Sequence, residues 1–323
     1  MRAIRFDRTG GPEVLEWVEV ERPTPGPGQV LVRNTAVGIN FIDTYHRGGL
    51  YPVKLPSGLG SEGAGVVEAV GEGVTRFQPG DPIAYGSGPL GAYAEFHVVA
   101  ADRAAKPPAG IDARTAAAAM LKGMTAEFLL LRCFPLQSGQ TCLIHAAAGG
   151  VGSILVQWAK HLGATVIATV GSEDKAKVAR DLGADHVILY GEADVAKEVR
   201  AFTDGKGVPV VYDGVGAATF EGSLASLARR GMLISYGNAS GPAPAVEPLR
   251  LSRGGSLFLT RPTLFDYVAT AEEYEASAAA LFAVMASGAV KIQIGQTFPL
   301  AEARRAHEAL ESRATVGASL LIP

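Results

Sequence analysis

The sequence has few cysteines, no block of basic residues and no long hydrophobic run. Only two of its 323 residues are cysteine, Cys133 and Cys142, so a cysteine-rich zinc lobe is excluded and a disulfide framework is not expected. The formal net charge is −3, and no cluster of lysine and arginine suggests a nucleic-acid surface. No apolar run reaches the ~18 residues of a membrane span, and MRAIRFDRTGG lacks the apolar core of a signal peptide. We therefore expect a cytoplasmic protein that neither binds nucleic acid nor spans a membrane.

Proline is absent from residues 141–200, whereas residues 1–100 contain 9 prolines and 17 glycines. In the proline-rich region, these turn formers separate short β-like runs such as QVLVRNTAVGI, GAGVVEAVG, DPIAYG and AYAEFHVV. Short strands with closely spaced turn signals are typical of a β-barrel or a β-sandwich. The first third of the chain is therefore predicted to be a β domain.

Strand and helix patterns alternate in the proline-free region and beyond it. The buried-strand patterns are TCLIHA, TVIATV, HVIL, VPVVYD, MLISYG and SLFLTRP; helices are expected at 151–162, from Ser172 to about 182, and near 194–203 and 219–229. Such a series predicts a parallel, doubly wound sheet. Further on, the sequence predicts a helix near 271–287, a second one in AEARRAHEALES and a closing strand, ASLLI.

The stretch LIHAAAGGVGSILVQWAKHLGA, residues 143–164, reads as a strand, a glycine turn and a helix. Gly149 and Gly152 match the second and third glycines of the Gly-x-Gly-x-x-Gly fingerprint, but Ala147 stands where the first glycine is expected. In a dinucleotide site these glycines let the backbone approach the pyrophosphate and let the helix pack on the sheet. A plain strand-to-helix turn remains the alternative.

The end of the second strand of this series, ATVGSEDKAK, bears on the choice of cofactor. NAD sites place an acidic residue there to bind the ribose hydroxyls, whereas this chain has Gly171 and Ser172. Lys175 could bind a 2′-phosphate, so NADPH is predicted in preference to NADH. Glu173 and Asp174 lie nearby and complicate this prediction, although acidic residues in a first helical turn also complement the helix dipole.

Several segments together resemble the NADPH:quinone oxidoreductases of the zeta-crystallin type, within the medium-chain dehydrogenase/reductase superfamily. They are GPEVLE, GINFIDTYHRGGLYP, LPSGLGSEGAGVV, the glycine turn, VVYDGVG, RRGMLISYGNASG, GSLFLTRP and ESRATVGASLLIP. The resemblance implies an α/β protein: a GroES-like β-barrel domain over 1–122, completed by 264–323, and an inserted Rossmann-type, NADPH-binding doubly wound sheet over 123–263. It also implies hydride transfer from NADPH to a small-molecule quinone. A homodimer is expected through the sheet edge GSLFLTRP, because an unpaired apolar edge invites pairing.

The same resemblance argues against a metal. Where the zinc alcohol dehydrogenases place a cysteine and a histidine ligand, this chain has Asn40 and Ser61, neither of which is a good zinc ligand. The glutamate of the same motif is present here as Glu62, and we expect it to pair with another residue inside the barrel. We therefore expect a zinc-independent enzyme with no metal-binding residues.

The resemblance places Asn40, Tyr45 and Tyr51 near the nicotinamide, as the candidate catalytic residues. An amide or a phenol can donate a hydrogen bond to a carbonyl that gains negative charge, although plain barrel packing is the alternative for both tyrosines. For Asp43, a turn or cap role is favoured over a direct contact. The expected cofactor site contains Phe41, Ile42, Asp43, Thr44, Tyr45, Thr125, Phe128, Gly149, Gly150, Val151, Gly152, Gly171, Ser172, Lys175, Tyr190, Gly214, Tyr236, Gly237, Asn238, Ala239, Arg261, Thr263 and Arg313.

Two other functions stay open at this point. An alkenal or enone reductase of the same superfamily would use the same fold and the same hydride. A non-catalytic, zeta-crystallin-like protein that binds nucleotide or RNA is the alternative from another class. The sequence does not distinguish among quinones, between one- and two-electron transfer, or between a dimer and a tetramer, and it does not identify the proton donor.

Overall fold

The computed structural model describes residues 1–323, which form two compact units. The β-rich unit consists of Met1–Met124, Tyr267–Ser287 and Ile292–Pro323, and the parallel-sheet unit consists of Thr125–Asp266 and Gly288–Lys291. The sequence expectation instead places the boundaries at 122/123 and 263/264. Gly288–Lys291 return to the parallel-sheet unit, where the side chain of Gln157 donates to the carbonyl of Lys291 (3.0 Å) and accepts from its amide (2.9 Å).

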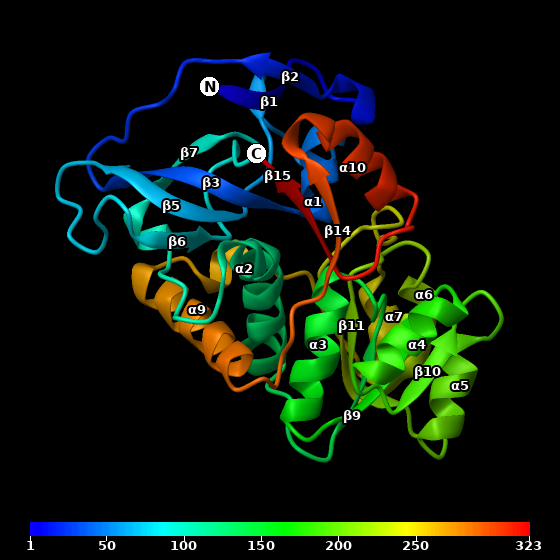
Figure 1. The fold of residues 1–323 in the computed structure, drawn as a ribbon. Coiled ribbons are helices and arrows are strands. Elements are labelled where there is room, and N and C mark those ends of the chain that lie inside the picture. Colours follow the sequence, from blue (N-terminus) through cyan, green and yellow to red (C-terminus); the bar gives the residue numbers. More distant parts are fainter. The chain divides into compact units, whose positions relative to one another are not determined.

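Six strands and the helices between them build the parallel-sheet unit (Figure 1). The strands are β8 (Thr141–Ile144), β9 (Thr165–Val170), β10 (His186–Leu189), β11 (Val208–Asp213), β12 (Leu227–Ser235) and β13 (Phe258–Thr260). The helices are α3 (Gly150–His161), α4 (Glu173–Asp181), α5 (Val195–Phe202), α6 (Phe220–Ser226) and α7 (Pro248–Arg253). The short α8 (Leu264–Tyr267) follows β13 and ends at the first residue that returns to the β-rich unit.

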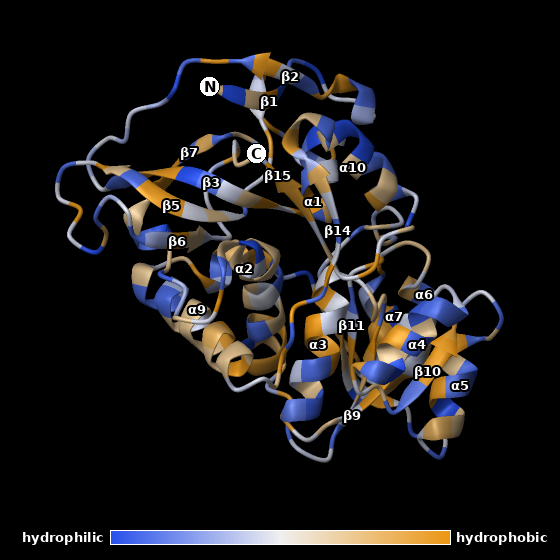
Figure 2. Cartoon of the chain, viewed as in Figure 1, coloured by the Kyte–Doolittle hydropathy of each residue, from blue (hydrophilic) through white to orange (hydrophobic).

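All strand pairs of this sheet are parallel, in the order β10-β9-β8-β11-β12-β13. The order reverses between β8 and β11, and in doubly wound sheets ligands bind at the carboxyl ends of the strands beside that point. The strands are coloured as hydrophobic in Figure 2, as expected for a parallel sheet covered on both faces. The predicted doubly wound sheet is therefore confirmed.

One element of this unit differs from the sequence prediction. The helix expected near 219–229 ends at Ser226, and β12 begins at Leu227, ahead of the predicted strand MLISYG. Leu227 pairs with Val208 before a register shift, and Arg230 within this irregular stretch has a left-handed φ of 64°. The bulged strand therefore includes residues 227–229, which a regular pattern assigns to the helix.

The β-rich unit holds two antiparallel-rich sheets. Strands β2 (Glu16–Glu19), β1 (Arg2–Phe6) and β4 (Ser57–Gly58) form the smaller sheet in that order. The larger sheet runs β14 (Ile294–Pro299), β15 (Ala318–Ile322), β3 (Gln29–Ile39), β5 (Gly63–Val70) and β6 (Pro82–Tyr85), and β7 (Phe96–Ala100) also pairs with β3. Its helices are α1 (Phe41–Gly48), α9 (Ala271–Ala286) and α10 (Ala303–Glu311); α2 (Ala113–Phe128) begins in this unit and is followed by a π-helical turn, Leu129–Cys133.

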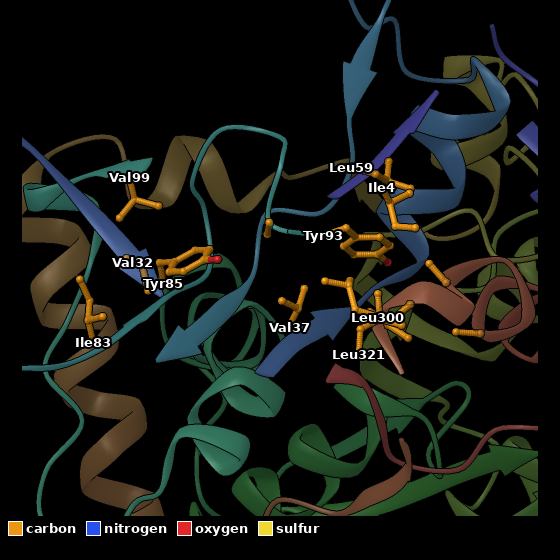
Figure 3. Close-up of a cluster of buried hydrophobic side chains, with 14 of the residues drawn as sticks. Ile4, Val32, Val37, Leu59, Ile83, Tyr85, Tyr93, Val99, Leu300 and Leu321 are labelled. Atoms are coloured by element: carbon orange, nitrogen blue, oxygen red, sulfur yellow. The ribbon is translucent and has the colours of Figure 1, made fainter. Parts of the chain in front are cut away.

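The last segment of the chain completes the β-rich unit. β15 pairs antiparallel with β3, and Leu300 and Leu321 belong to the same buried cluster as Ile4, Val37 and Tyr93 (Figure 3). This shared core explains why ASLLI reads as a buried strand. No helix of the chain combines the length and the apolarity that a bilayer crossing requires.

Candidate functional site

The turn between β8 and α3 leaves the start of α3 open to an anion. Gly149 is the N-cap residue and provides no side-chain cap, and the first turn of α3 contains no acidic residue. The N–H groups of Gly150, Val151 and Gly152 therefore lack intrahelical acceptors, and the positive end of the helix dipole is uncompensated. A Cβ at Gly152 would lie 2.2 Å from the carbonyl oxygen of Ala146, so only glycine fits there.

Ala147 does not need to be glycine in this turn. The residue with a left-handed backbone is its neighbour Ala146, with a φ of 51°. Ala147 is buried, and its amide donates to the carbonyl oxygen of Thr169 at the end of β9 (3.1 Å). The turn therefore needs no glycine at position 147, and a hydrogen bond to the neighbouring strand holds Ala147 in place.

The carboxyl end of β9 presents a small residue, a capping hydroxyl and a tyrosine. Ser172 caps α4, its Oγ accepting from the amide of Lys175 (3.4 Å). A Cβ at Gly171 would lie 2.5 Å from the hydroxyl of Tyr190, a half-exposed side chain that follows β10. Glu173 and Asp174 lie in the first turn of α4, where the carboxylate of Glu173 accepts from Arg180 of the same helix (2.6 Å).

Two further turns, after β11 and β12, approach each other closely. A Cβ at Gly237 would lie 2.4 Å from the carbonyl oxygen of Gly214, and a Cβ at Gly214 would lie 2.8 Å from the ring of Tyr236. The amide of Ala239 also donates to Gly214 (3.3 Å). The structure therefore brings together four of the predicted residues, which follow the neighbouring strands β11 and β12: Gly214, Tyr236, Gly237 and Ala239.

Other predicted residues of this unit lie at its loops and helix ends. Asn238 accepts from the amide of Gly241 (2.9 Å), and Arg261 donates to the carbonyl of Pro262 (3.0 Å) in the loop that holds Thr263. Thr125 and Phe128 lie at the end of α2, and both are buried.

In the β-rich unit, the predicted catalytic residues lie on or beside α1. The rings of Tyr45 and Tyr51 meet edge to face, with their centroids 5.3 Å apart. Phe41, Ile42 and Thr44 belong to the first turns of the same helix, where the hydroxyl of Thr44 donates to the carbonyl of Phe41 (2.7 Å). Arg313 lies beyond α10 with a left-handed φ of 59°.

Asn40 is the N-cap residue of α1, and its side chain is tied to a buried carboxylate. Its Nδ2 donates to Oε2 of Glu62 (2.8 Å); because a carboxylate only accepts, this contact fixes which amide atom faces Glu62. The same oxygen accepts from the ammonium of Lys122 (2.6 Å). Oε1 of Glu62 accepts from the amide of Leu121 (2.7 Å), so both carboxylate oxygens are satisfied.

Asp43 is buried beneath α1 rather than presented outward. Its Oδ2 accepts from the amide of Asn40 (2.8 Å) and from the hydroxyl of Tyr93 (2.9 Å). Burial is the main cause that raises the pKa of Asp43 to about 7, against hydrogen bonds that lower it. The carboxylate therefore serves the cap of α1, the role that the sequence favours over a direct cofactor contact.

Sequence reasoning missed the polar groups that support these positions. Lys122 lies in the apolar run AAAAMLKGMT, where a single lysine signals a buried cation, and His145 lies in the strand pattern TCLIHA. Tyr93, His307 and Arg47 form a second buried chain that ends at Asp43: Arg47 contacts Nδ1 of His307 (2.9 Å), and Nε2 of His307 contacts the hydroxyl of Tyr93 (3.1 Å). No local pattern reveals this chain, because its members are more than 40 residues apart.

Known proteins match the whole chain. Residues 26–109 match the family described as "Alcohol dehydrogenase GroES-like domain", and residues 150–283 match "Zinc-binding dehydrogenase". A quinone oxidoreductase of Pseudomonas aeruginosa is 53% identical, with 100% of this chain and 99% of the relative covered. A 2-haloacrylate reductase of Burkholderia is 45% identical, with 99% and 98% covered. The structure of the Escherichia coli quinone oxidoreductase complexed with NADPH superposes with a TM-score of 0.98 at 48% identity, covering 100% of both chains.

Proposed function

Because this chain belongs to the quinone oxidoreductase family of the medium-chain dehydrogenase/reductase superfamily, we propose that it is a reductase that transfers a hydride from NADPH to quinones. The observation that carries the proposal is the end-to-end match at 53% identity to a quinone oxidoreductase. The family resemblance drawn from the sequence motifs and the GroES-like and Rossmann-type fold class are both confirmed.

The residues of the parallel-sheet unit fit a dinucleotide. The uncapped start of α3 offers the N–H groups of Gly150 and Val151 to a pyrophosphate. Gly171, Ser172 and Tyr190 are assigned to the adenosine half, and the turns that hold Gly214 and Tyr236–Ala239 to the nicotinamide half. NADPH, when bound, supplies a hydride from C4 of its nicotinamide.

The preference for NADPH over NADH is supported by charge. Gly171 and Ser172, which follow β9, carry no carboxylate, and Glu173, the first of the two acidic residues in the first turn of α4, pairs with Arg180. We assign Lys175 and Arg313 to the 2′-phosphate.

On the substrate side, Asn40, Tyr45 and Tyr51 are assigned to the reacting oxygen. The phenols of Tyr45 and Tyr51 can donate hydrogen bonds to a carbonyl oxygen that gains negative charge during reduction. Asn40 already uses one N–H on Glu62, which leaves it a single amide N–H for a substrate.

The reaction is proposed to need no zinc. The carboxylate of Glu62 is buried and already holds a cation, the ammonium of Lys122. Asn40 and Ser61 are poor zinc ligands, and no group of three or more histidine, cysteine, aspartate or glutamate residues has a metal-binding arrangement. These residues do not fit a catalytic zinc.

A homodimer is proposed through β13. This three-residue strand pairs only with β12 and forms one edge of the sheet, and its Phe258 is 54% exposed. A second copy pairing edge to edge would cover this apolar side chain. A cytoplasmic location and the absence of nucleic-acid binding stay predictions.

One relative favours a second candidate substrate. The 2-haloacrylate reductase matches 99% of the chain at 45% identity, so reduction of an activated alkene is the alternative activity. Steady-state NADPH oxidation by the purified protein, with a benzoquinone, a naphthoquinone, an enone and 2-chloroacrylate, separates the two. Quinone-dependent oxidation is expected to have the highest kcat/KM. A higher kcat/KM with the enone or the haloacrylate would favour the alkene activity, and no turnover of any quinone would overturn the proposal.

A further inference from the structure

Four buried polar side chains meet beneath the carboxyl ends of three central strands. His145 follows β8, Thr169 lies in β9, Asp213 ends β11, and Ser223 lies in α6. Each is at most 1% exposed. Nδ1 of His145 lies 2.8 Å from Oγ1 of Thr169, and Nε2 lies 2.9 Å from Oγ of Ser223, which in turn donates to Oδ2 of Asp213 (2.7 Å).

The donors of this cluster can be assigned from its acceptors. The single hydroxyl proton of Ser223 goes to Asp213, since a carboxylate only accepts. Oγ of Ser223 is therefore the acceptor for Nε2–H of His145. Burial lowers the pKa of His145 and keeps the ring neutral, so Nδ1 accepts from the hydroxyl of Thr169. One tautomer satisfies all three contacts, and the chain of donors runs from Thr169 to Asp213.

The cluster also holds the turns that follow the strands. Oδ1 of Asp213 accepts from the amides of Val215 (2.8 Å) and Gly216 (3.1 Å), which fixes the turn after β11. The carbonyl of Thr169 accepts from Ala147, in the turn after β8. Each of these turns contains or adjoins residues assigned above to the dinucleotide. The hydrogen bonds thus connect the turns after β8 and β11 to strand β9 without depending on any side chain that faces outward.

We propose that the His145–Thr169–Ser223–Asp213 cluster is a positioning device for the dinucleotide, which sets the turns after β8 and β11 against strand β9 in their binding arrangement before the cofactor arrives. This inference rests on the proposed function, because it takes those turns to bind NADPH. The four residues are positioning residues, since each is buried and acts through the backbone of the turns. Preorganisation of this kind strengthens binding by reducing the ordering that the ligand must impose.

Helix α6 offers a matched control. Ser223 and Ser226 lie one turn apart on this helix and are both fully buried, but Ser226 donates only to the carbonyl of Gly222 in its own helix (2.7 Å). Ser223→Ala removes the bridge between His145 and Asp213, whereas Ser226→Ala removes a hydroxyl of the same kind outside the cluster.

The test measures NADPH dissociation constants by fluorescence titration of the full chain. Ser223→Ala is expected to raise the Kd about tenfold, the size of effect that follows when one buried hydrogen bond orients a binding loop. Ser226→Ala is expected to leave the Kd within about twofold. The fragment adenosine 2′,5′-bisphosphate, which lacks the nicotinamide half, should bind Ser223→Ala as it binds the wild type, because the Thr169–His145 contact remains.

A second pair of variants covers the case in which Ser223→Ala fails to fold. Thr169→Val keeps the shape of the side chain but loses the hydroxyl, and it should weaken NADPH and the fragment alike, while Thr169→Ser should restore both. Wild-type-like NADPH binding by Ser223→Ala or Thr169→Val would overturn the inference, and so would equal weakening by Ser226→Ala. If the wild type itself bound no NADPH, the proposed function would fall together with the inference.

Discussion

The buried pair of Glu62 and Lys122 allows a stability prediction with a definite size. The two charges are 2.6 Å apart, and their side chains are 0% and 5% exposed. Removing one partner of such a pair leaves an uncompensated buried charge, which lowers the free energy of unfolding by about 3–5 kcal/mol. Lys122→Met keeps the aliphatic stem and removes only the ammonium, so it should show this loss. The backbone amide of Leu121 and the side-chain Nδ2 of Asn40 remain as donors to Glu62, which places the expected value toward the lower end.

A double variant separates the charge from the packing. Glu62→Gln in the Lys122→Met background removes the uncompensated charge, and it should recover at least half of the lost stability. The exposed pair of Arg304 and Glu308 is the control: its side chains are 60% and 51% exposed, and Arg304→Met should change stability by less than about 0.5 kcal/mol.

The assay follows the β-rich unit alone. The chain has two tryptophans, Trp17 in the β-rich unit and Trp158 in the parallel-sheet unit, so in a Trp158→Phe background the fluorescence reports Trp17. Urea denaturation of this background and its variants gives the free energies. A loss below about 1 kcal/mol for Lys122→Met would refute the reasoning, as would a double variant as unstable as the sum of the single ones.

Three further predictions concern the cofactor, the metal and pH. Combined Lys175→Ala and Arg313→Ala should raise the KM for NADPH about tenfold or more and leave that for NADH within about twofold, because each lost phosphate contact is a charge-assisted hydrogen bond; equal effects would contradict the 2′-phosphate assignment. Dialysis against a chelator should leave quinone reduction unchanged, and a loss restored by zinc would contradict the metal-free proposal. Burial lowers the pKa of His97 to about 4, whereas in the unfolded chain the pKa stays near the ordinary histidine value of 6.5, so the unfolded state binds more protons between these values and stability rises with pH across that window. His97→Gln should reduce that slope by up to about 1.4 kcal/mol per pH unit in equilibrium unfolding, and an unchanged slope would show that His97 does not titrate as proposed.

The parallel-sheet unit was largely predictable because its signals are local. The strands over 165–170, 186–189 and 208–213 have the predicted bounds, and Ser172 caps α4 as expected. When glycine and helix-capping residues flank a buried strand, both ends of the strand can be predicted from the sequence. The early start of β12 was not predictable, because a register shift against β11 determines it.

The candidate site was less predictable because its supporting contacts are long-range. No sequence pattern indicates that Asn40 donates to Glu62, 22 residues away, or that Lys122 contacts the same carboxylate from 60 residues away. The family resemblance assigns Asn40 to the nicotinamide and the sequence favours a cap role for Asp43, and in the structure both serve the cap of α1. Replacing Asn40 therefore perturbs both the helix start and any substrate contact, so loss of activity alone does not identify a catalytic role.

Lys122 supplies the positive charge that the buried carboxylate of Glu62 requires. Glu62 follows Ser61, at which the resemblance to the zinc alcohol dehydrogenases implies a histidine ligand in those enzymes, and its carboxylate is fully buried. A buried carboxylate requires a compensating cation and hydrogen bonds to each oxygen. With Asn40 and Ser61 in place of metal ligands, the compensation comes from the ammonium of Lys122 and two N–H donors. Replacing Asn40 and Ser61 by cysteine and histidine would therefore not create a zinc site while Lys122 still occupies the carboxylate.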